Sequence, residues 1–236
     1  MTNPLLEYID TPSPARPPQQ APVNTGGAMK FHGEVAHGYD AKRENTAKWK
    51  VEQEIIEGWL SELSPGTRVL DAPVGSGRFL PHMVKQQLEF VGLDIQPDML
   101  VQAALKVLPL EAVEAWVAQC NQQDKIVPLR IKGMGALMVG DVRKTGAPDK
   151  AVDVAINCRI TRWMMGNFGP QGVVEMLREM QRVASKKIIL TARVYGHQFA
   201  VTEDLIKSAL DGWKITRDAP GYELAYRILM LEPTSA

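Results

Sequence analysis

The stretch 68–80, with the sequence RVLDAPVGSGRFL, restricts the possible fold of this chain more than any other stretch. A short apolar run ends there at the acidic Asp71, and a turn with Gly75 and Gly77 follows before helical spacing resumes. Glycine leaves the backbone open to a ligand, and the N-terminus of the next helix offers unpaired N–H groups. The stretch therefore predicts a strand, a turn and a helix that together bind a nucleotide-type cofactor.

The turn departs from the dinucleotide-binding fingerprint G-x-G-x-x-G. Leu80 stands where that fingerprint has its last glycine, and Pro73 stands at the start of the turn. Asp71 puts a carboxylate at the strand end, where it would repel a pyrophosphate but could attract an ammonium or sulfonium, directly or through water. A positively charged cofactor therefore fits this turn better than a dinucleotide does.

Three further apolar runs end in a polar residue, and helical segments separate them. Asp94 follows Asp71 by 23 residues, close to the spacing of about 20 residues at which a strand-end acid reaches a ribose. Strands that alternate with helices predict a doubly wound, mostly parallel α/β sheet. The four strand-end positions are Asp71, Asp94, Asp141 (after Gly140) and Asn157.

With these strand ends, the stretch 68–80 resembles motif I of the class I S-adenosylmethionine-dependent methyltransferases, an acid followed by a G-x-G turn whose first glycine varies. The resemblance covers about 48–232 and implies a Rossmann-like, doubly wound sheet of seven mostly parallel strands with an antiparallel C-terminal hairpin. The runs 214–217 and 223–231 fit that hairpin, which is not expected of a dinucleotide dehydrogenase.

The resemblance also implies S-adenosylmethionine as the cofactor and a set of residues that bind it. In that family the second strand end binds the ribose, the third contacts the adenine, and the glycine turn and the fourth strand end lie beside the methionine moiety. An arginine in a Y-D-x-x-R segment such as 39–43 would hold the methionine carboxylate. The implied cofactor residues are Asp71, Gly75, Gly77, Asp94, Ile95, Asp141, Val142, Asn157 and Arg43.

The chain divides into a proline-rich N-terminal arm (1–28), expected to be disordered, a helical cap (29–66) and a Rossmann-like methyltransferase domain (67–236). That domain carries an insertion around 108–135, expected to form a helix at the sheet edge. The segment 157–163 is expected to line the ligand crevice, and a helix is predicted over 172–184. Two cysteines and the lack of a membrane-length apolar run favour a cytoplasmic protein.

The sequence predicts transfer of a methyl group by in-line displacement, for which the protein mainly aligns the reactants and excludes water. A small molecule is the expected acceptor, because there is no [D/N/S]-P-P-aromatic motif after the fourth strand, no basic tract with interleaved aromatic residues and no added recognition module. Basic and acidic residues balance at 27 each, so a polyanionic partner is not indicated. A nucleic acid or protein acceptor and the oligomeric state stay open.

His197, in the loop after the fifth strand, is the candidate general base, with an ordinary exposed histidine as the alternative. No other catalytic residue, no metal and no membrane association is predicted. Cys158 is better explained as a small apolar residue at a strand end than as a nucleophile. Two other functions stay open: a lyase or hydrolase that consumes S-adenosylmethionine, and a non-catalytic binding or structural protein on the same fold.

Overall fold

The computed structural model describes residues 33–221 and 226–234, so the arm predicted over 1–28 lies outside the described residues. Its centre is one sheet with the strand order β3-β4-β2-β1-β5-β6-β8-β7. The strands are β1 (Arg68–Asp71), β2 (Glu89–Asp94), β3 (Leu129–Ile131), β4 (Gly135–Val139), β5 (Val152–Asn157), β6 (Ala184–Arg193), β7 (Trp213–Pro220) and β8 (Tyr226–Pro233).

The doubly wound sheet with its reversed hairpin is confirmed. Strands β4, β2, β1, β5 and β6 are parallel to their neighbours in that series, and β8 lies antiparallel between β6 and β7. The predicted number of seven strands is wrong, because β3 adds an eighth by pairing antiparallel with β4. With only three residues, β3 is too short to give a strand pattern in the sequence.

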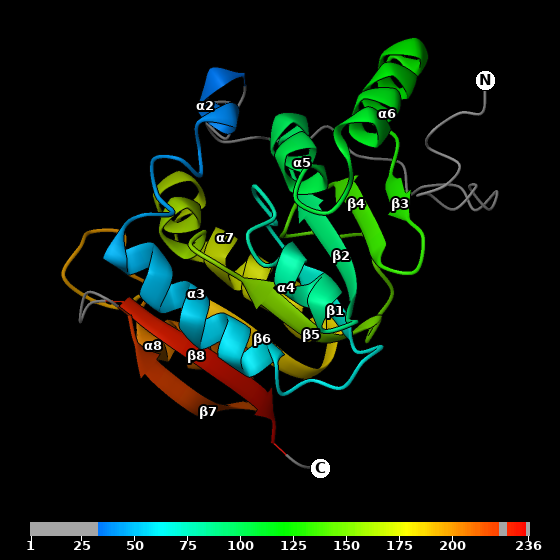
Figure 1. Ribbon diagram of the computed structural model, residues 1–236. Coiled ribbons are helices and arrows are strands. Elements are labelled where there is room, and N and C mark those ends of the chain that lie inside the picture. The colour runs from blue at the N-terminus through cyan, green and yellow to red at the C-terminus, as the bar shows by residue number, and fades with distance from the viewer. Residues whose placement is uncertain (1–32, 222–225, 235–236) are drawn as a thin grey trace.

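Helices cover both faces of the sheet (Figure 1). On one face, α3, α4, α5 and α6 bury side chains in a core that includes Ile56, Leu80, Leu100 and Trp116; α7 and α8 build a second core on the other face. Alternate residues of a strand enter the two cores, as Val69 and Leu70 of β1 do. The helices are α2 (Glu34–His37), α3 (Ala47–Leu60), α4 (Leu80–Lys85), α5 (Pro97–Ala104), α6 (Leu110–Gln123), α7 (Thr161–Val183) and α8 (Glu203–Ala209).

Helix α7 differs from the prediction, which began the helix at Gly172. It starts eleven residues earlier at Thr161 and is interrupted at Gly169, where φ is +64°. Pro170 follows that break, and Met164 is buried in the first part of the helix. The glycine and proline in the middle of the run hide the helical spacing of its first half.

The expected insertion contains α6 and β3, which lie at the edge of the sheet next to β4 (Figure 1). Trp116 anchors α6, because its ring is buried and its indole N–H donates to the carbonyl of Val127 at 3.0 Å. Among the described residues, no helix is both long and apolar enough to cross a membrane.

Candidate functional site

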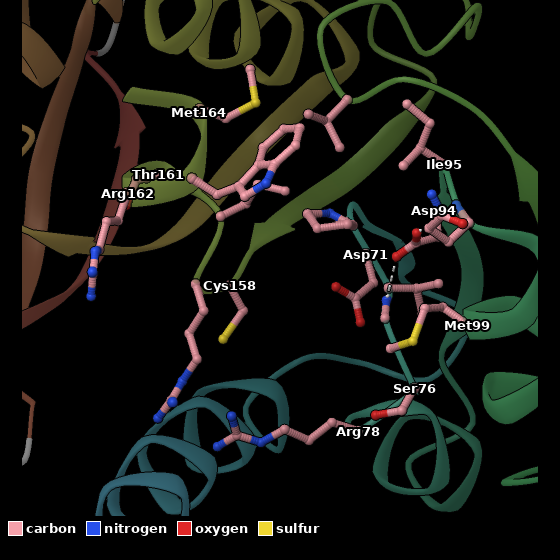
Figure 2. A pocket seen from close by; sticks show the side chains of 18 of the residues that line it. Asp71, Ser76, Arg78, Asp94, Ile95, Met99, Cys158, Thr161, Arg162 and Met164 are labelled. Atoms are coloured by element: carbon pink, nitrogen blue, oxygen red, sulfur yellow. Dashed lines mark hydrogen bonds between the residues drawn. The ribbon is translucent and has the colours of Figure 1, made fainter. Parts of the chain in front are cut away.

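A cavity of about 740 Å³ opens at the carboxyl ends of the parallel strands β1, β2, β4 and β5. Strand β1 lies between β2 and β5. The strands that follow β1 in the sequence are first added on the β2 side of the sheet and then, from β5 on, on the opposite side. Such a switch point leaves a crevice outside the strand ends, and this is where open α/β sheets bind ligands. Figure 2 shows the side chains that converge there.

Asp71 and Asp94 lie at adjacent strand ends and line the cavity, although only 1% and 6% of their surfaces are exposed. Asp94 accepts backbone N–H bonds from Gly75 and Gln96, each at 2.9 Å. Burial raises its pKa to about 6, and the backbone donors limit that rise. The strand end is thus held in a fixed position by its own carboxylate.

The pKa of Asp71 is shifted further than the pKa of Asp94. Burial raises its pKa to about 8, the negative charge of Asp94 adds to this rise, and Arg78 opposes it. Its Oδ2 has no hydrogen-bond partner within the described ranges. A buried, unsatisfied carboxyl group next to a cavity is a site for a cationic or hydrogen-bond-donating ligand.

The two glycines of the turn have different roles. Gly75, at φ +55°, lines the cavity and leaves ordinary space for a Cβ. Gly77, at φ +76°, packs against α5, where an added Cβ would lie 2.7 Å from the Cα of Ala103. Gly77 is not among the described residues that line the cavity, so it brings α5 close to the turn instead.

Asp141 and Val142 line the cavity on the loop after β4, and Ile95 lines it after β2. The carboxylate of Asp141 turns back on its own loop: it accepts the backbone N–H of Arg143 at 2.9 Å and the guanidinium of the same residue at 2.6 Å. Any further ligand of Asp141 must share the carboxylate with Arg143.

Asn157 does not reach the cavity surface as far as the chain is described. It is fully buried, and its Nδ2 donates to the carbonyl of Ala72 at 2.9 Å. It thereby ties the end of β5 to the start of the glycine turn. The sequence placed Asn157 at the correct strand end, but it did not predict that the side chain lies behind the cavity wall.

Arg43 lines the cavity from the segment between α2 and α3. Its guanidinium lies 3.8 Å from the ring centroid of Tyr39, and its Nη1 donates to the carbonyl of that residue at 2.9 Å. The same segment is fastened to the glycine turn by Asp40, which accepts from Ser76 at 2.5 Å and pairs with Lys106 at 2.7 Å.

Glu52 escaped the sequence reasoning, because its ion pairs form between elements that are far apart in the sequence. Glu52 of α3, only 4% exposed, pairs with Arg78 at 3.1 Å and with Arg159, and accepts the thiol of Cys158 at 3.4 Å. Burial and the charge of Glu52 raise the pKa of the Cys158 thiol well above its usual range, so the cysteine stays protonated. The signal in the sequence was a glutamate on the buried stripe of an amphipathic helix, three residues after Trp49.

His197 is not part of the cavity wall formed by the described residues. Its Nδ1 accepts the backbone N–H of Phe199, which does line the cavity, at 3.0 Å. Partial burial and the positive charges of Arg162 and Arg193 lower the pKa of the imidazole, so it is neutral at physiological pH. No group of three or more acidic, histidine or cysteine side chains within the described ranges could hold a metal ion.

Comparison with solved structures identifies the fold. The chain is similar to magnesium protoporphyrin IX methyltransferase (ChlM) from Synechocystis PCC 6803 with bound S-adenosylmethionine, with a TM-score of 0.60, 18% identity and coverage of 92% of this chain and 100% of that one. It is also similar to Burkholderia thailandensis 1,6-didemethyltoxoflavin-N1-methyltransferase with bound 1,6-didemethyltoxoflavin and S-adenosylhomocysteine, with a TM-score of 0.55, 14% identity and coverage of 94% and 95%.

A third similar structure, the [4+2]-cyclase SpnF, has a TM-score of 0.51 and 13% identity over 78% of this chain and 81% of that one. No protein-family model matches the chain, and no curated protein matches it. Many of the structural neighbours are S-adenosylmethionine-dependent methyltransferases. At these identities the similarity shows that the chain has the class I methyltransferase fold, and the reaction has to be argued from the site.

Proposed function

We propose that this protein binds S-adenosylmethionine in the cavity and transfers its methyl group to a small-molecule acceptor. The observation that carries the proposal is Asp71, whose buried Oδ2 has no partner among the described residues and whose pKa is raised to about 8. A cationic ligand beside it would satisfy both the orphaned oxygen and the carboxylate charge. The structural neighbours solved with S-adenosylmethionine or S-adenosylhomocysteine support the same cofactor.

The other cavity residues fit the cofactor by their chemistry. We assign the ribose hydroxyls to Asp94, whose two oxygens each accept one backbone bond and keep a lone pair for a ligand. Ile95 and Val142 supply apolar surface for the adenine, and Asp141 supplies an acceptor that it shares with Arg143. For the methionine carboxylate we assign Arg43, which carries a guanidinium at the cavity wall.

When bound, S-adenosylmethionine supplies a methyl group on a positively charged sulfur that is already a good leaving group. The residues of this chain then have to orient the reactants and exclude water. The segment around Asp40 is held to Ser76 of the glycine turn and to Lys106, and we assign it the role of limiting the access of water from that side. His197 remains our candidate for a base; it is neutral, as a base must be, and it contacts the cavity-lining Phe199 through that residue's backbone.

Calorimetric titration with S-adenosylmethionine and S-adenosylhomocysteine tests cofactor binding, with NAD as the negative control. We expect micromolar affinity, about −8 kcal/mol, and its loss in Asp94→Ala. Asp211→Ala removes an exposed aspartate on the turn before β7 and should bind as the wild type does. Absence of binding to both sulfur ligands, or equal losses in the two variants, would refute the proposal.

The similarity to a [4+2]-cyclase favours testing one other class of function, a reaction on this fold without methyl transfer. Product analysis after incubation with S-adenosylmethionine separates the possibilities. S-adenosylhomocysteine formed only in the presence of an acceptor identifies a methyltransferase. Methylthioadenosine or homoserine formed without an acceptor identifies a lyase or hydrolase, and cofactor binding without any product indicates a binding protein.

A further inference from the structure

The cavity carries opposite charges at its two ends. Its acidic end is formed by the strand ends of β1 and β2, with Asp71 and Asp94. Its basic end is formed where β5 leads into α7, with Arg159 and Arg162. Figure 2 shows Asp71 and Asp94 on one side of the pocket and Arg162 on the other. The whole chain has no net charge, so this separation is a local property of the site.

Arginine charge exceeds carboxylate charge at the basic end. Glu52, which is buried behind this end, forms ion pairs with both Arg78 and Arg159, so two guanidinium groups share one carboxylate. The side chain of Arg78 is only 7% exposed, and its Nε has no hydrogen-bond partner within the described ranges. A buried donor of this kind normally has a partner, so the charge of Arg78 is not fully compensated within the described residues.

Arg162 adds a further positive charge in the first turn of α7. The helix dipole disfavours a cation at this position, because the N-terminal end of a helix is itself positive. The side chain of Arg162 is exposed, and within the described ranges it forms no ion pair that would offset this cost; the aromatic residues Trp163 and Phe199 are among those that line the same cavity. An anion bound next to Arg162 would remove the unfavourable interaction.

Aromatic rings line the same end. Trp49 stacks under the guanidinium of Arg78, with 3.9 Å between the Cζ atom and the ring centroid. Phe199 and Tyr226 approach from the loop after β6 and from the start of β8. Flat apolar side chains between arginines offer stacking surface for a planar ring and donors for its anionic substituent.

We propose that the acceptor is an aromatic small molecule that carries an anionic oxygen group, a carboxylate or a phosphate, and binds with that group toward Arg162. This inference rests on the proposed function, since it concerns the second substrate of the same site. Arg43 takes no part in it, because that residue is assigned to the cofactor. A cationic or uncharged ring would leave the arginine charge uncompensated and would bind less tightly.

The test uses 8-anilinonaphthalene-1-sulfonate, an aromatic anion whose fluorescence rises on binding, with the full chain saturated with S-adenosylhomocysteine. Competitors of equal ring size then displace it: 2-naphthoate, 2-naphthyl phosphate, neutral 2-naphthamide and cationic 2-naphthylmethylamine. We expect at least one of the two anions to compete about ten times more strongly than the amide, and the amine to be weakest. The stronger of the two anions identifies the oxygen group.

Variants connect the effect to the proposed residue. Arg162→Ala should weaken the favoured anion about tenfold and leave the amide unchanged, and Arg162→Lys should restore part of the affinity. Arg130→Ala is the matched control, because it removes an exposed arginine from β3 at the far edge of the sheet. Equal competition by the amide, or equal effects of the two alanine variants, would overturn the inference.

The design separates this inference from the proposed function. If S-adenosylhomocysteine binds but the anions show no preference over the amide, the acceptor class is wrong and the cofactor assignment stands. If S-adenosylhomocysteine does not bind in the calorimetric titration, the proposed function fails, whatever the competitors do.

Discussion

Replacing Asp71 by asparagine tests the central electrostatic argument about the site. In the free protein, the raised pKa of about 8 means that Asp71 holds a proton at neutral pH. A cationic cofactor next to the group favours the carboxylate, so binding must expel that proton. Asparagine has nearly the same size and cannot titrate, so the variant removes the linked proton and the negative charge while it keeps the shape of the side chain.

The magnitude follows from the pKa. At pH 7 a group with a pKa of about 8 is protonated in about 0.9 of the molecules, so about 0.9 proton should be released per cofactor bound. Between pH 6 and 7.5 the fraction in the carboxylate form rises about 20-fold, and the affinity of the wild type relative to Asp71→Asn should rise by the same factor. The ratio cancels the titration of the amino group of the ligand, which falls near 8.

Isothermal titration calorimetry in two buffers of different ionisation enthalpy measures both quantities. The difference in heat between the buffers gives the number of protons released, and the series from pH 6 to 7.5 gives the change in affinity. Titrating S-adenosylmethionine and S-adenosylhomocysteine side by side shows whether the sulfonium is involved, because only the first carries that charge. Asp211→Asn, with its exposed side chain on the turn before β7, is the control.

Two results would refute the reasoning. One is binding by the wild type without proton release at pH 7. The other is a pH dependence that Asp71→Asn retains in full, which would assign the titration to another group such as Asp94, with its pKa of about 6.

Three further predictions concern stability and are measured by chemical or thermal unfolding. Because folded Asp71 keeps its proton to higher pH than the unfolded chain does, its contribution to the free energy of unfolding declines from about pH 4 to pH 8, by up to about 1.4 kcal/mol per pH unit. Asp71→Asn should remove this decline. An unchanged pH profile of stability in the variant would contradict the raised pKa. Gly77→Ala should lower the free energy of unfolding by about 2–4 kcal/mol, because the added Cβ would collide with α5. Gly133→Ala, at a similar φ but in open space, should lower it by only about 1 kcal/mol. Equal losses in the two variants would contradict the packing argument. Glu52→Gln should lower the free energy of unfolding by about 3–5 kcal/mol, because it leaves Arg78 and Arg159 without their buried carboxylate. The exposed Glu62→Gln should lower it by less than about 1 kcal/mol. A loss below about 1 kcal/mol in both variants would show that the buried ion pairs are weak.

Much of the fold could be predicted from the sequence because its signals are local. The strands β1, β2 and β5 are short, mainly apolar runs that end in a polar residue, and the turn after β1 needs glycine at two positive φ angles. The same locality explains the errors. Strand β3 is three residues long and forms only because β4 lies next to it, and the first half of α7 is hidden by Gly169 and Pro170.

The site was partly predictable for the same reason. Strand ends of a parallel sheet meet at one edge, so Asp71, Asp94 and Asp141 could be placed at one cavity from their order along the chain. How far each side chain is buried could not be read in this way. Gly77 and Asn157 lie at the expected turn and strand end, yet they support the cavity wall from behind.

The sequence by itself thus determined the alternation of strands and helices that predicts a doubly wound sheet, and the acids at the strand ends, because these signals depend on near neighbours along the chain. The reversed hairpin followed from the resemblance to the methyltransferase family. Only the tertiary structure decided which charges face each other. Glu52 and Arg159 are 107 residues apart and share a buried ion pair. The unsatisfied oxygen of Asp71 and the excess of arginine around Arg162 likewise exist only once α3, β1 and α7 are packed together, since burial and electrostatic interaction depend on distance in space.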